Sequence, residues 1–510
     1  MLRIFSDEIS NPKNFVVTLE LVPGRESGGR SVDTLKGIAQ DAFADGRISA
    51  VSITDNPGGN PSLSPDVLGS EIFKCGLDVI VHFACRDLNR VGMESRALQL
   101  ASMGMKNILA LTGDYSGKGF GGQGKPVFDF DSVLLTTMLK SLNQRLLKSG
   151  DPDGFFTGCA VSPFKTTEAE THAQYGKLDK KLGAGASFVV TQLGYDVEKF
   201  RELIKVLLQK GMNPPVMGSV YLLSPRSARA MNRGRVPGAY VSDRLFNQVI
   251  KEWSIIRSGL KTAIDRAAKL GVILKGLGYR GIHIGGVHKS FKTVVAILDR
   301  MDEIEDSWED FIPEFNLGRT HSCYYLFNPP VSDEKLPVPA MIKEKITEHY
   351  PHAVLRTAHN LFFDKKAGFA PFYRKLAVML EKNNKAWLLK LILEDPLKKT
   401  MLSCQSCGDC AIQHLAFQCP ESGCPKHTRN GACGGSRDGW CEVHPDRKCV
   451  WVRAYARLKY CGLALTLGRD FVPPRMWELN KTSSWINFHL GKDHQKDDSQ
   501  SFQVKTIPPV

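Results

Sequence analysis

The chain has 510 residues, of which 42% are hydrophobic and 24% charged, which excludes disorder over most of its length and predicts two or more domains. No run approaches the ~18 apolar residues that a membrane helix needs, and acidic residues at positions 7 and 8 interrupt any signal peptide. The net charge of +14 is dispersed, without an arginine-rich arm or aromatic RNA-binding signature. We therefore expect a cytoplasmic protein with no membrane insertion and no nucleic-acid partner.

The first three hundred residues alternate between short apolar runs and segments of helical periodicity. The runs that predict strands are 15–21, 50–54, 78–83, 107–111, 155–161, 188–192, 215–220 and 281–286. Helical periods between them include 95–104, 131–148 and 197–211. Eight such units in about 300 residues favour an α/β fold of the (β/α)8 TIM-barrel type, with an open doubly wound sheet as the alternative.

Polar and titratable residues recur where the apolar runs stop. They are Glu20, Thr54, Asp55, His82, Gly113, Asp114, Gly158, Gln192 and the segment 285–289. In a barrel the carboxyl ends of all strands meet at one rim, where catalytic groups gather. Any one of these residues is also explained by a chain becoming polar as it leaves a core, so the prediction depends on the set.

The rest of the chain divides by composition. We expect the barrel over 1–310, a linker and helical segment over 311–400, a cysteine-rich domain over 401–485 and a polar tail over 486–510. Proline-rich residues 328–342 mark the linker, and helices are predicted at 340–348 and 371–395. Residues 489–503 lack apolar periodicity, so we expect a mobile tail.

Eight of the thirteen cysteines lie between positions 404 and 449, a clustering that indicates metal or cluster ligation in a cytosolic protein. They are Cys404, Cys407, Cys410, Cys419, Cys424, Cys433, Cys441 and Cys449, enough for two four-cysteine sites. The C-x2-C-x2-C triple at the start favours [4Fe–4S] clusters, and structural zinc is the main alternative. Disulfides are a third possibility.

The strand-end motifs resemble those of 5,10-methylenetetrahydrofolate reductases, over roughly residues 12–300. The matching segments are TLELVPGR (18–25), VSITDNPGG (51–59), VHFACRD (81–87), ALTGD (110–114), LDKKLGAGASFVVTQ (178–192) and HIGG (283–286). The glutamate of the first strand, the TGD turn and the K-x-x-AGA-x4-TQ pattern are the most specific parts. Their order and spacing carry the resemblance.

The resemblance implies a flavoenzyme of one-carbon metabolism, serving methionine or acetyl-CoA synthesis, that reduces methylenetetrahydrofolate to 5-methyltetrahydrofolate. It matches Glu20 to the proton donor that opens the folate ring and Asp114 to a carboxylate between flavin and pterin, and a raised pKa would suit Glu20. Gln192 matches a pterin ligand, and Lys289 lies where a basic residue would meet the folate glutamate. The positions implied for the flavin, FAD or alternatively FMN, are Thr54, Asp55, His82, Thr112, Gly113, Asp114, Gly158, Lys180 and Lys181.

Several departures bear on the cofactor and the electron donor. Thr112 stands where better-known members of the family have an arginine, and Asp55 where an aromatic residue often contacts the flavin. Residues 221–240 lack the aromatic and glutamine side chains expected beside NADH or folate. Electrons are therefore expected from NAD(P)H or from a redox partner protein.

Residues 419–435 and 441–451 resemble a C-terminal domain that is fused to, or encoded beside, reductases of anaerobes and acetogens. That resemblance implies a module for stability, partner docking or electron input, and we expect an oligomer. Two other functions stay open: a non-catalytic electron-transfer or scaffold subunit, and a folate-dependent methyltransferase without flavin. The presence of both Glu20 and Asp114 argues against the scaffold.

Overall fold

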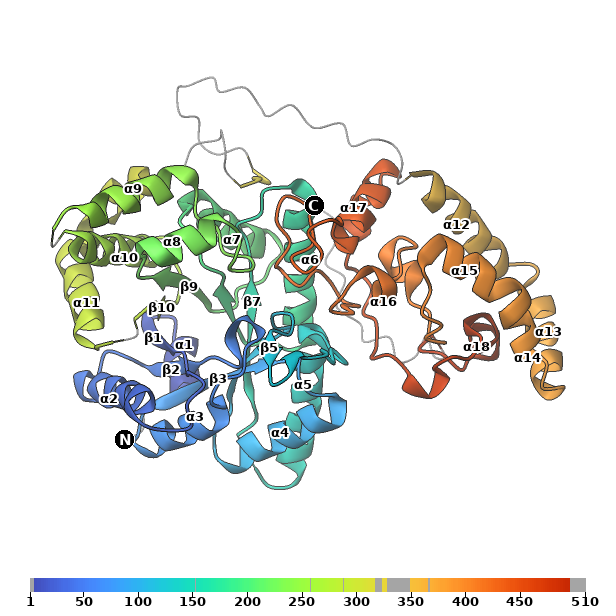
Figure 1. The fold of residues 1–510 in the computed structure, drawn as a ribbon, viewed down its shortest axis with the longest axis horizontal. Helices are drawn as coiled ribbons and strands as arrows, with labels where there is room; N and C mark the ends of the chain where they lie inside the picture. Colours follow the sequence, from blue (N-terminus) through green and yellow to red (C-terminus); the bar gives the residue numbers. More distant parts are fainter. Residues whose placement is uncertain are drawn as a thin grey trace, which may run out of the picture.

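The computed structural model describes residues 4–151, 153–256, 258–287, 289–316, 323–327, 349–365 and 367–495. They form two regions side by side, a barrel of strands and helices and a mostly helical C-terminal region (Figure 1). Residues 323–327 pack on the barrel, where the Tyr325 hydroxyl donates to Asp196 at 2.5 Å and the Leu326 N–H to Glu202 at 2.6 Å. The predicted linker at 328–342 and the helix at 340–348 lie outside the described residues.

Eight parallel strands close into a barrel in the order β1-β10-β9-β8-β7-β4-β3-β2, which confirms the predicted TIM-barrel fold and excludes the open sheet. Strands β1 and β10 close it, with Val16 opposite Gly281 and Leu19 opposite Ile284. The strands are β1 (Val16–Leu21), β2 (Ala50–Ile53), β3 (Asp78–Ala84), β4 (Asn107–Leu111), β7 (Phe156–Val161), β8 (Phe188–Thr191), β9 (Val216–Tyr221) and β10 (Gly281–Gly285). Short strands β5 (Lys118–Gly119) and β6 (Gly122–Gln123) form an exposed hairpin after β4.

Helices cover the outside of the barrel. They are α2 (Arg30–Asp45), α3 (Pro65–Lys74), α4 (Arg90–Ser102), α5 (Ser132–Lys148), α6 (Glu168–Ala184), α7 (Val197–Gln209), α8 (Pro225–Asn232), α9 (Asp243–Ser254), α10 (Gly259–Gly276) and α11 (Lys292–Ile304), with 3₁₀ turns η1 (Pro57–Gly59) and η2 (Glu305–Phe315). In α7, Phe200, Leu203 and Leu207 recur on one buried face, as helical periodicity requires. The Asp196 carboxylate caps this helix by accepting from two backbone N–H groups.

The amino end of the barrel is closed by α1 (Phe5–Ser10). Phe5 packs edge-on against Phe156 and Phe188, with ring centroids 6.1 and 5.3 Å away. Its backbone N–H donates to Asp78, the first residue of β3, at 2.9 Å. The opposite, carboxyl end of the strands is therefore the end available to ligands.

The C-terminal region is helical at its edges and irregular between residues 403 and 449. Its elements are α12 (His349–Phe362), α13 (Ala370–Lys382), α14 (Ala386–Leu389), η5 (Lys390–Glu394), α15 (Asp395–Leu402), η6 (Ile412–Leu415), α16 (Pro420–Gly423), α17 (Val450–Tyr460), η7 (Ala464–Thr466), η8 (Trp477–Leu479) and α18 (Ser484–Leu490). The helix predicted over 371–395 is thus a series of shorter helices. None of the helices in the described ranges has the length and hydropathy that crossing a bilayer requires.

The polar tail begins later than the composition predicts. Helix α18 runs to Leu490, and His494 is buried against the Asp409 carboxylate. Phe488 of α18 packs against Phe363, and polar contacts such as that of His494 hold the residues after the helix, which have no apolar periodicity to reveal them. Residues 496–510 lie outside the described part of the chain.

The two regions meet along α6. Helix α17 packs on α6 (Figure 1), and Ala173 of α6 shares a small apolar cluster with Leu415, Trp451 and Tyr455. The Tyr455 hydroxyl also donates to Glu168 at 2.7 Å. Because α6 follows strand β7, this contact brings the C-terminal region to the carboxyl rim of the barrel.

Candidate active site at the carboxyl rim

Glu20 is a half-buried carboxyl near the end of β1. A Cβ atom added to Gly285 would lie 3.0 Å from Oε2 of Glu20, so the two residues are in close contact. Glu20 is also near the Tyr221 phenol, whose pKa is raised mainly by burial and further by the Glu20 charge. Within the described ranges nothing donates a hydrogen bond to Glu20. Burial raises its pKa from 4.5 to about 7, so the carboxyl keeps its proton near neutral pH.

Two polar atoms at neighbouring rim positions are buried without a hydrogen-bond partner among the described residues. They are Oγ1 of Thr54, after β2, and Nε2 of His82, in β3, on residues only 7% and 8% exposed. Burial lowers the pKa of His82 to about 4, so its ring is neutral. An unpaired buried polar atom costs about 1–3 kcal/mol, and a bound ligand relieves that cost. Both positions are ones that the sequence resemblance assigns to a flavin, so the residues fit that group.

The Thr112–Asp114 turn follows β4. Gly113 has φ of +89°, a conformation that glycine adopts without strain. The Asp114 carboxylate accepts from the Gly58 N–H at 2.9 Å. Two buried lysines reach the turn: Lys177 donates to Thr112 Oγ1 at 3.3 Å, and Lys426 to the Gly113 carbonyl at 2.7 Å. Positive charge thus lies where the resemblance leads one to expect an arginine at position 112.

Two of the predicted flavin positions have structural partners instead. The Asp55 carboxylate accepts from the Ala84 N–H at 3.0 Å and pairs with Arg96 at 2.7 Å. Gly158 lies inside β7, and a Cβ atom there would meet the Phe188 ring at 2.2 Å. Close packing inside the barrel therefore explains this glycine, and an ion pair explains Asp55.

The other predicted residues differ in how close they come to the rim. Lys181 donates to the Ala160 carbonyl at 2.6 Å, and Lys180 lies 5.9 Å from the Trp451 ring; burial lowers the pKa of both lysines to about 8. Gln192 donates to the Pro237 carbonyl at 3.0 Å. Lys289 is exposed. Glu20 lies near the carboxyl end of β1 and Asp114 follows β4, so both carboxylates are at the same mouth of the parallel barrel.

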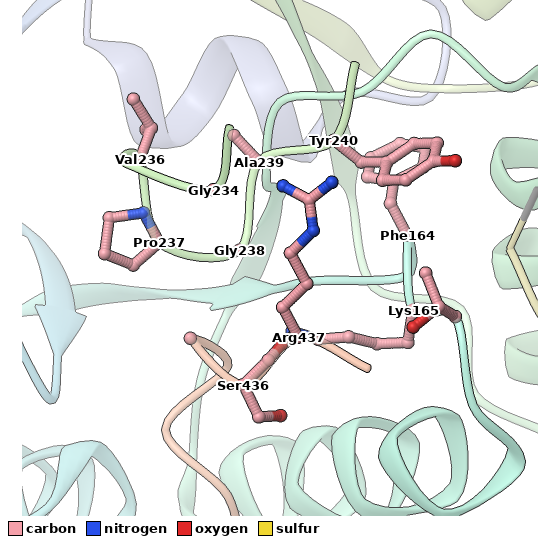
Figure 2. A pocket seen from close by; sticks show the side chains of 12 residues that line it. Phe164, Lys165, Gly234, Val236, Pro237, Gly238, Ala239, Tyr240, Ser436 and Arg437 are labelled. Atoms are coloured by element: carbon pink, nitrogen blue, oxygen red, sulfur yellow. Dashed lines mark hydrogen bonds between the residues drawn. The ribbon is translucent and has the colours of Figure 1, made fainter. Parts of the chain in front are cut away.

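Residues 426–438 of the C-terminal region, which we call the capping segment, lie across this rim. Lys177 donates to the Gly431 carbonyl at 3.1 Å and Lys165 to the Ser436 carbonyl at 2.7 Å. Figure 2 shows Arg437 extending toward the loop over 234–240, next to a hollow with about 340 Å³ of free space, part of it open to solvent. Sequence reasoning missed Lys165, Lys177 and Lys426, because nothing marks a lysine as buried.

The eight clustered cysteines fall into two spatial groups. Cys424, Cys433, Cys441 and Cys449 line one small cavity, which we call the four-cysteine cavity. In the second group, burial raises the pKa of Cys407 to about 12, and neighbouring Cys410 and Cys419 raise it as well. Cys410 and Cys404 both act on Lys398, so Cys404 belongs to this group.

All thirteen cysteines are free thiols, which leaves the disulfide alternative without support. Burial raises the pKa of Cys449 well above its usual range, and Cys433 and Cys424 add to the effect. A thiol binds metal as the thiolate. Neighbouring thiolates repel one another, and a bound cation would offset that repulsion, so such a group of thiols suits a metal site. Over the described residues, no three histidine, cysteine, aspartate or glutamate side chains are already in position to hold a metal ion.

Comparisons with known proteins agree with the motifs. Residues 6–255 match the family model described as methylenetetrahydrofolate reductase, and residues 388–478 the model described as methylene-tetrahydrofolate reductase C terminal. A probable methylenetetrahydrofolate reductase (NADPH) of Caenorhabditis elegans is 26% identical over 158 residues, 31% of this chain and 22% of that protein. Methylenetetrahydrofolate reductase 1 of Schizosaccharomyces pombe is 21% identical over 308 residues, 58% of this chain and 49% of that protein. The chain thus spans about a fifth to a half of the length of these relatives.

Solved structures resemble the barrel only distantly. An uncharacterized protein from Clostridium thermocellum, described as binding two copies of 5-methyl-5,6,7,8-tetrahydrofolic acid, has a TM-score of 0.40 and 13% identity, covering 59% of this chain and 98% of its own. A 7,8-dihydropteroate synthase from Vibrio fischeri has a TM-score of 0.33 and 11% identity, covering 58% and 95%. With both family models matched in order along it, the chain belongs to the methylenetetrahydrofolate reductase family.

Proposed function

We propose that this protein is a flavin-dependent reductase that converts 5,10-methylenetetrahydrofolate to 5-methyltetrahydrofolate, with electrons from NAD(P)H or a redox partner. The observation that carries the proposal is Glu20, a half-buried carboxyl near the barrel mouth whose pKa is raised to about 7. A group that holds its proton near neutral pH is suited to general-acid catalysis. We further propose a cytoplasmic location and an oligomeric enzyme.

Glu20 would act on the folate. Protonating N10 opens the imidazolidine ring and leaves a cationic 5-iminium group, which is the form that accepts hydride. The Asp114 carboxylate on the same rim would stabilise that positive charge, since a preorganised opposite charge lowers the barrier to forming a cation. Gln192 keeps one amide N–H and one oxygen lone pair beyond its bonds to the Pro237 carbonyl and the Leu193 N–H, and with these it would orient the pterin ring.

Thr54, His82, Gly113, Lys180 and Lys181 would hold the flavin, FAD or FMN. The unpaired Thr54 Oγ1 and His82 Nε2 support this assignment, because a flavin heteroatom would satisfy each of them. When bound, the flavin supplies the hydride for the one-carbon unit. Asp55 and Gly158 are left out of the site, since Arg96 and Phe188 account for them.

The C-terminal region would bind iron–sulfur clusters, or alternatively zinc, at two sites. One would use the four-cysteine cavity, and the other Cys404, Cys407, Cys410 and Cys419. Four sulfur donors suit either metal. Such a module would stabilise the region or pass electrons toward the rim.

The test begins with protein purified without oxygen. Flavin absorbance is expected, and its absence would favour the methyltransferase alternative. Rapid mixing of chemically reduced enzyme with methylenetetrahydrofolate or with an artificial dye then measures two reoxidation rates. Glu20→Gln should slow the folate reaction by about 10²- to 10⁴-fold, as loss of a general acid does, and leave the dye reaction unchanged.

Asp78→Asn is the matched control, because it replaces a buried carboxyl at the opposite, amino end of the barrel. It should leave both rates near those of the wild type. Equal loss of the folate and dye reactions in Glu20→Gln would contradict the proton-donor role. A wild-type enzyme that is reoxidised by the dye but never by the folate would refute the proposed function.

A further inference from the structure

Lys426 is a buried cation that belongs to the C-terminal region but reaches the barrel. It is 3% exposed, and its Nζ donates to the Gly113 carbonyl at 2.7 Å across 313 residues of sequence. Gly113 immediately precedes Asp114, and the Lys426 ammonium also interacts electrostatically with the Asp114 carboxylate. One side chain therefore fixes the backbone of the turn and places positive charge beside its carboxylate.

The same lysine borders the four-cysteine cavity. Its ammonium forms an ion pair with Glu442, and both residues line the cavity with the four cysteines. Glu442 also accepts a hydrogen bond from the Cys433 thiol at 3.2 Å. A continuous series of contacts thus runs from a cavity sulfur through Glu442 and Lys426 to the turn at Asp114.

We propose that Lys426 is a positioning residue of the folate site, so that the C-terminal region completes the active site of the barrel. The inference rests on the proposed function, because it assigns Asp114 to the folate. Lys426 orders the Thr112–Asp114 turn and balances its negative charge, and it does not contact the reacting atoms. A displaced catalytic group lowers the rate of the chemical step, since productive geometry tolerates little error.

The competing explanation is that Lys426 only holds the two regions together. Lys165 separates these roles because it is 2% exposed and also crosses the interface, donating to the Gly434 and Ser436 carbonyls. In contrast to Lys426, Lys165 makes no contact with the Thr112–Asp114 turn in the described structure. Its replacement removes a buried cross-region lysine without touching the carboxylate.

The experiment compares Lys426→Met, Lys165→Met and Lys426→Arg in the full-length, flavin-loaded enzyme. Lys426→Met should slow reoxidation by methylenetetrahydrofolate by about 10- to 100-fold and leave reoxidation by the dye within about twofold. Lys165→Met should keep the folate rate within about threefold of the wild type. The two methionine variants should lower the melting temperature by similar amounts. Lys426→Arg, which keeps the charge, should recover part of the folate rate. If Lys426→Met does not fold, Lys426→Gln is measured in its place and judged by the same criteria.

The inference is overturned if the two methionine variants lose the folate reaction equally, or if Lys426→Met loses neither reaction. It is also overturned if Lys426→Met loses the folate and dye reactions together, because the defect would then lie in the flavin site. Failure of the proposed function is a separate result, since it is read from the wild type. An active wild type with indistinguishable variants refutes the role of Lys426 alone.

Discussion

The barrel and the C-terminal region are stabilised by different interactions. The barrel has a closed ladder of eight strands around a large apolar core, as expected of a fold that is stable by itself. In the C-terminal region the irregular segment 403–449 depends on buried charges, among them the Arg429–Asp409 pair at 2.9 Å, with side chains 3% and 0% exposed. Buried ion pairs and free thiols contribute less net stability than a hydrophobic core does. We therefore expect this region, unlike the barrel, to depend on bound metal or on contact with the rest of the chain.

Removing the metal that we propose for the cysteine groups should separate the two regions most clearly. Cys441→Ser, or a chelator that strips the metal, should unfold much of the C-terminal region, because metal binding contributes about 10 kcal/mol or more where it organises a small domain. Five of the seven tryptophans lie after residue 386, so tryptophan fluorescence follows this region. Cys75→Ser changes an exposed cysteine of the barrel and should leave metal content and melting unchanged. Intact metal content in Cys441→Ser would exclude this cysteine as a ligand.

Breaking one buried ion pair should have the next largest effect. Arg429→Met removes one buried partner of Asp409, whose contact with His494 remains, and should cost about 1–3 kcal/mol of unfolding free energy. Urea titration followed by fluorescence should show the loss in the C-terminal transition only. Arg447→Met, which removes an arginine that is 69% exposed, should change stability by less than about 0.5 kcal/mol. A loss shared by the barrel transition would mean that the two regions unfold as one.

The pH dependence should distinguish the rim of the barrel. The pKa of Glu20 is raised to about 7, so the proton-donating form is present below that pH. The rate of folate-dependent reoxidation should fall about tenfold per pH unit above 7, and the dye reaction should not follow it. The raised pKa also means that ionising Glu20 destabilises the fold as pH rises from 4.5 toward 7. Glu20→Gln should therefore gain stability relative to the wild type over that interval.

Lys289 should give the smallest effect. Its side chain is exposed, and an exposed ion pair contributes about 0–1 kcal/mol. Lys289→Ala should raise the KM for polyglutamylated folate by up to about fivefold with kcat unchanged. Steady-state kinetics with mono- and polyglutamylated substrates measures this difference. No change with either substrate would remove Lys289 from the folate site.

The barrel was predictable because its strands are short apolar runs with polar ends. The run at 107–111 coincides with β4, and the others end within a residue or so of the observed strands. The C-terminal region was less predictable, since charged pairs hold it. The contact between His494 and Asp409 joins residues 85 positions apart, and nothing in the sequence around either residue predicts it.

Site residues divide in the same way. Glu20 and Asp114 could be proposed from the sequence because a strand end fixes their location and a family motif their type. Asp55 matched the strand-end pattern equally well, but its partner Arg96 lies 41 residues away on the next helix but one. Lys177 and Lys426 were missed because their partners are 254 and 313 residues distant, and burial decides their role.

The contacts of the capping segment consist largely of single hydrogen bonds to backbone carbonyls, an arrangement that would make two separate proteins associate weakly. Here both halves are on one polypeptide, so closure is intramolecular and the effective concentration is of millimolar order. At that concentration an interface with an intrinsic dissociation constant of about 10 µM would be closed about 99% of the time. Covalent fusion therefore keeps the rim covered although each contact is weak by itself.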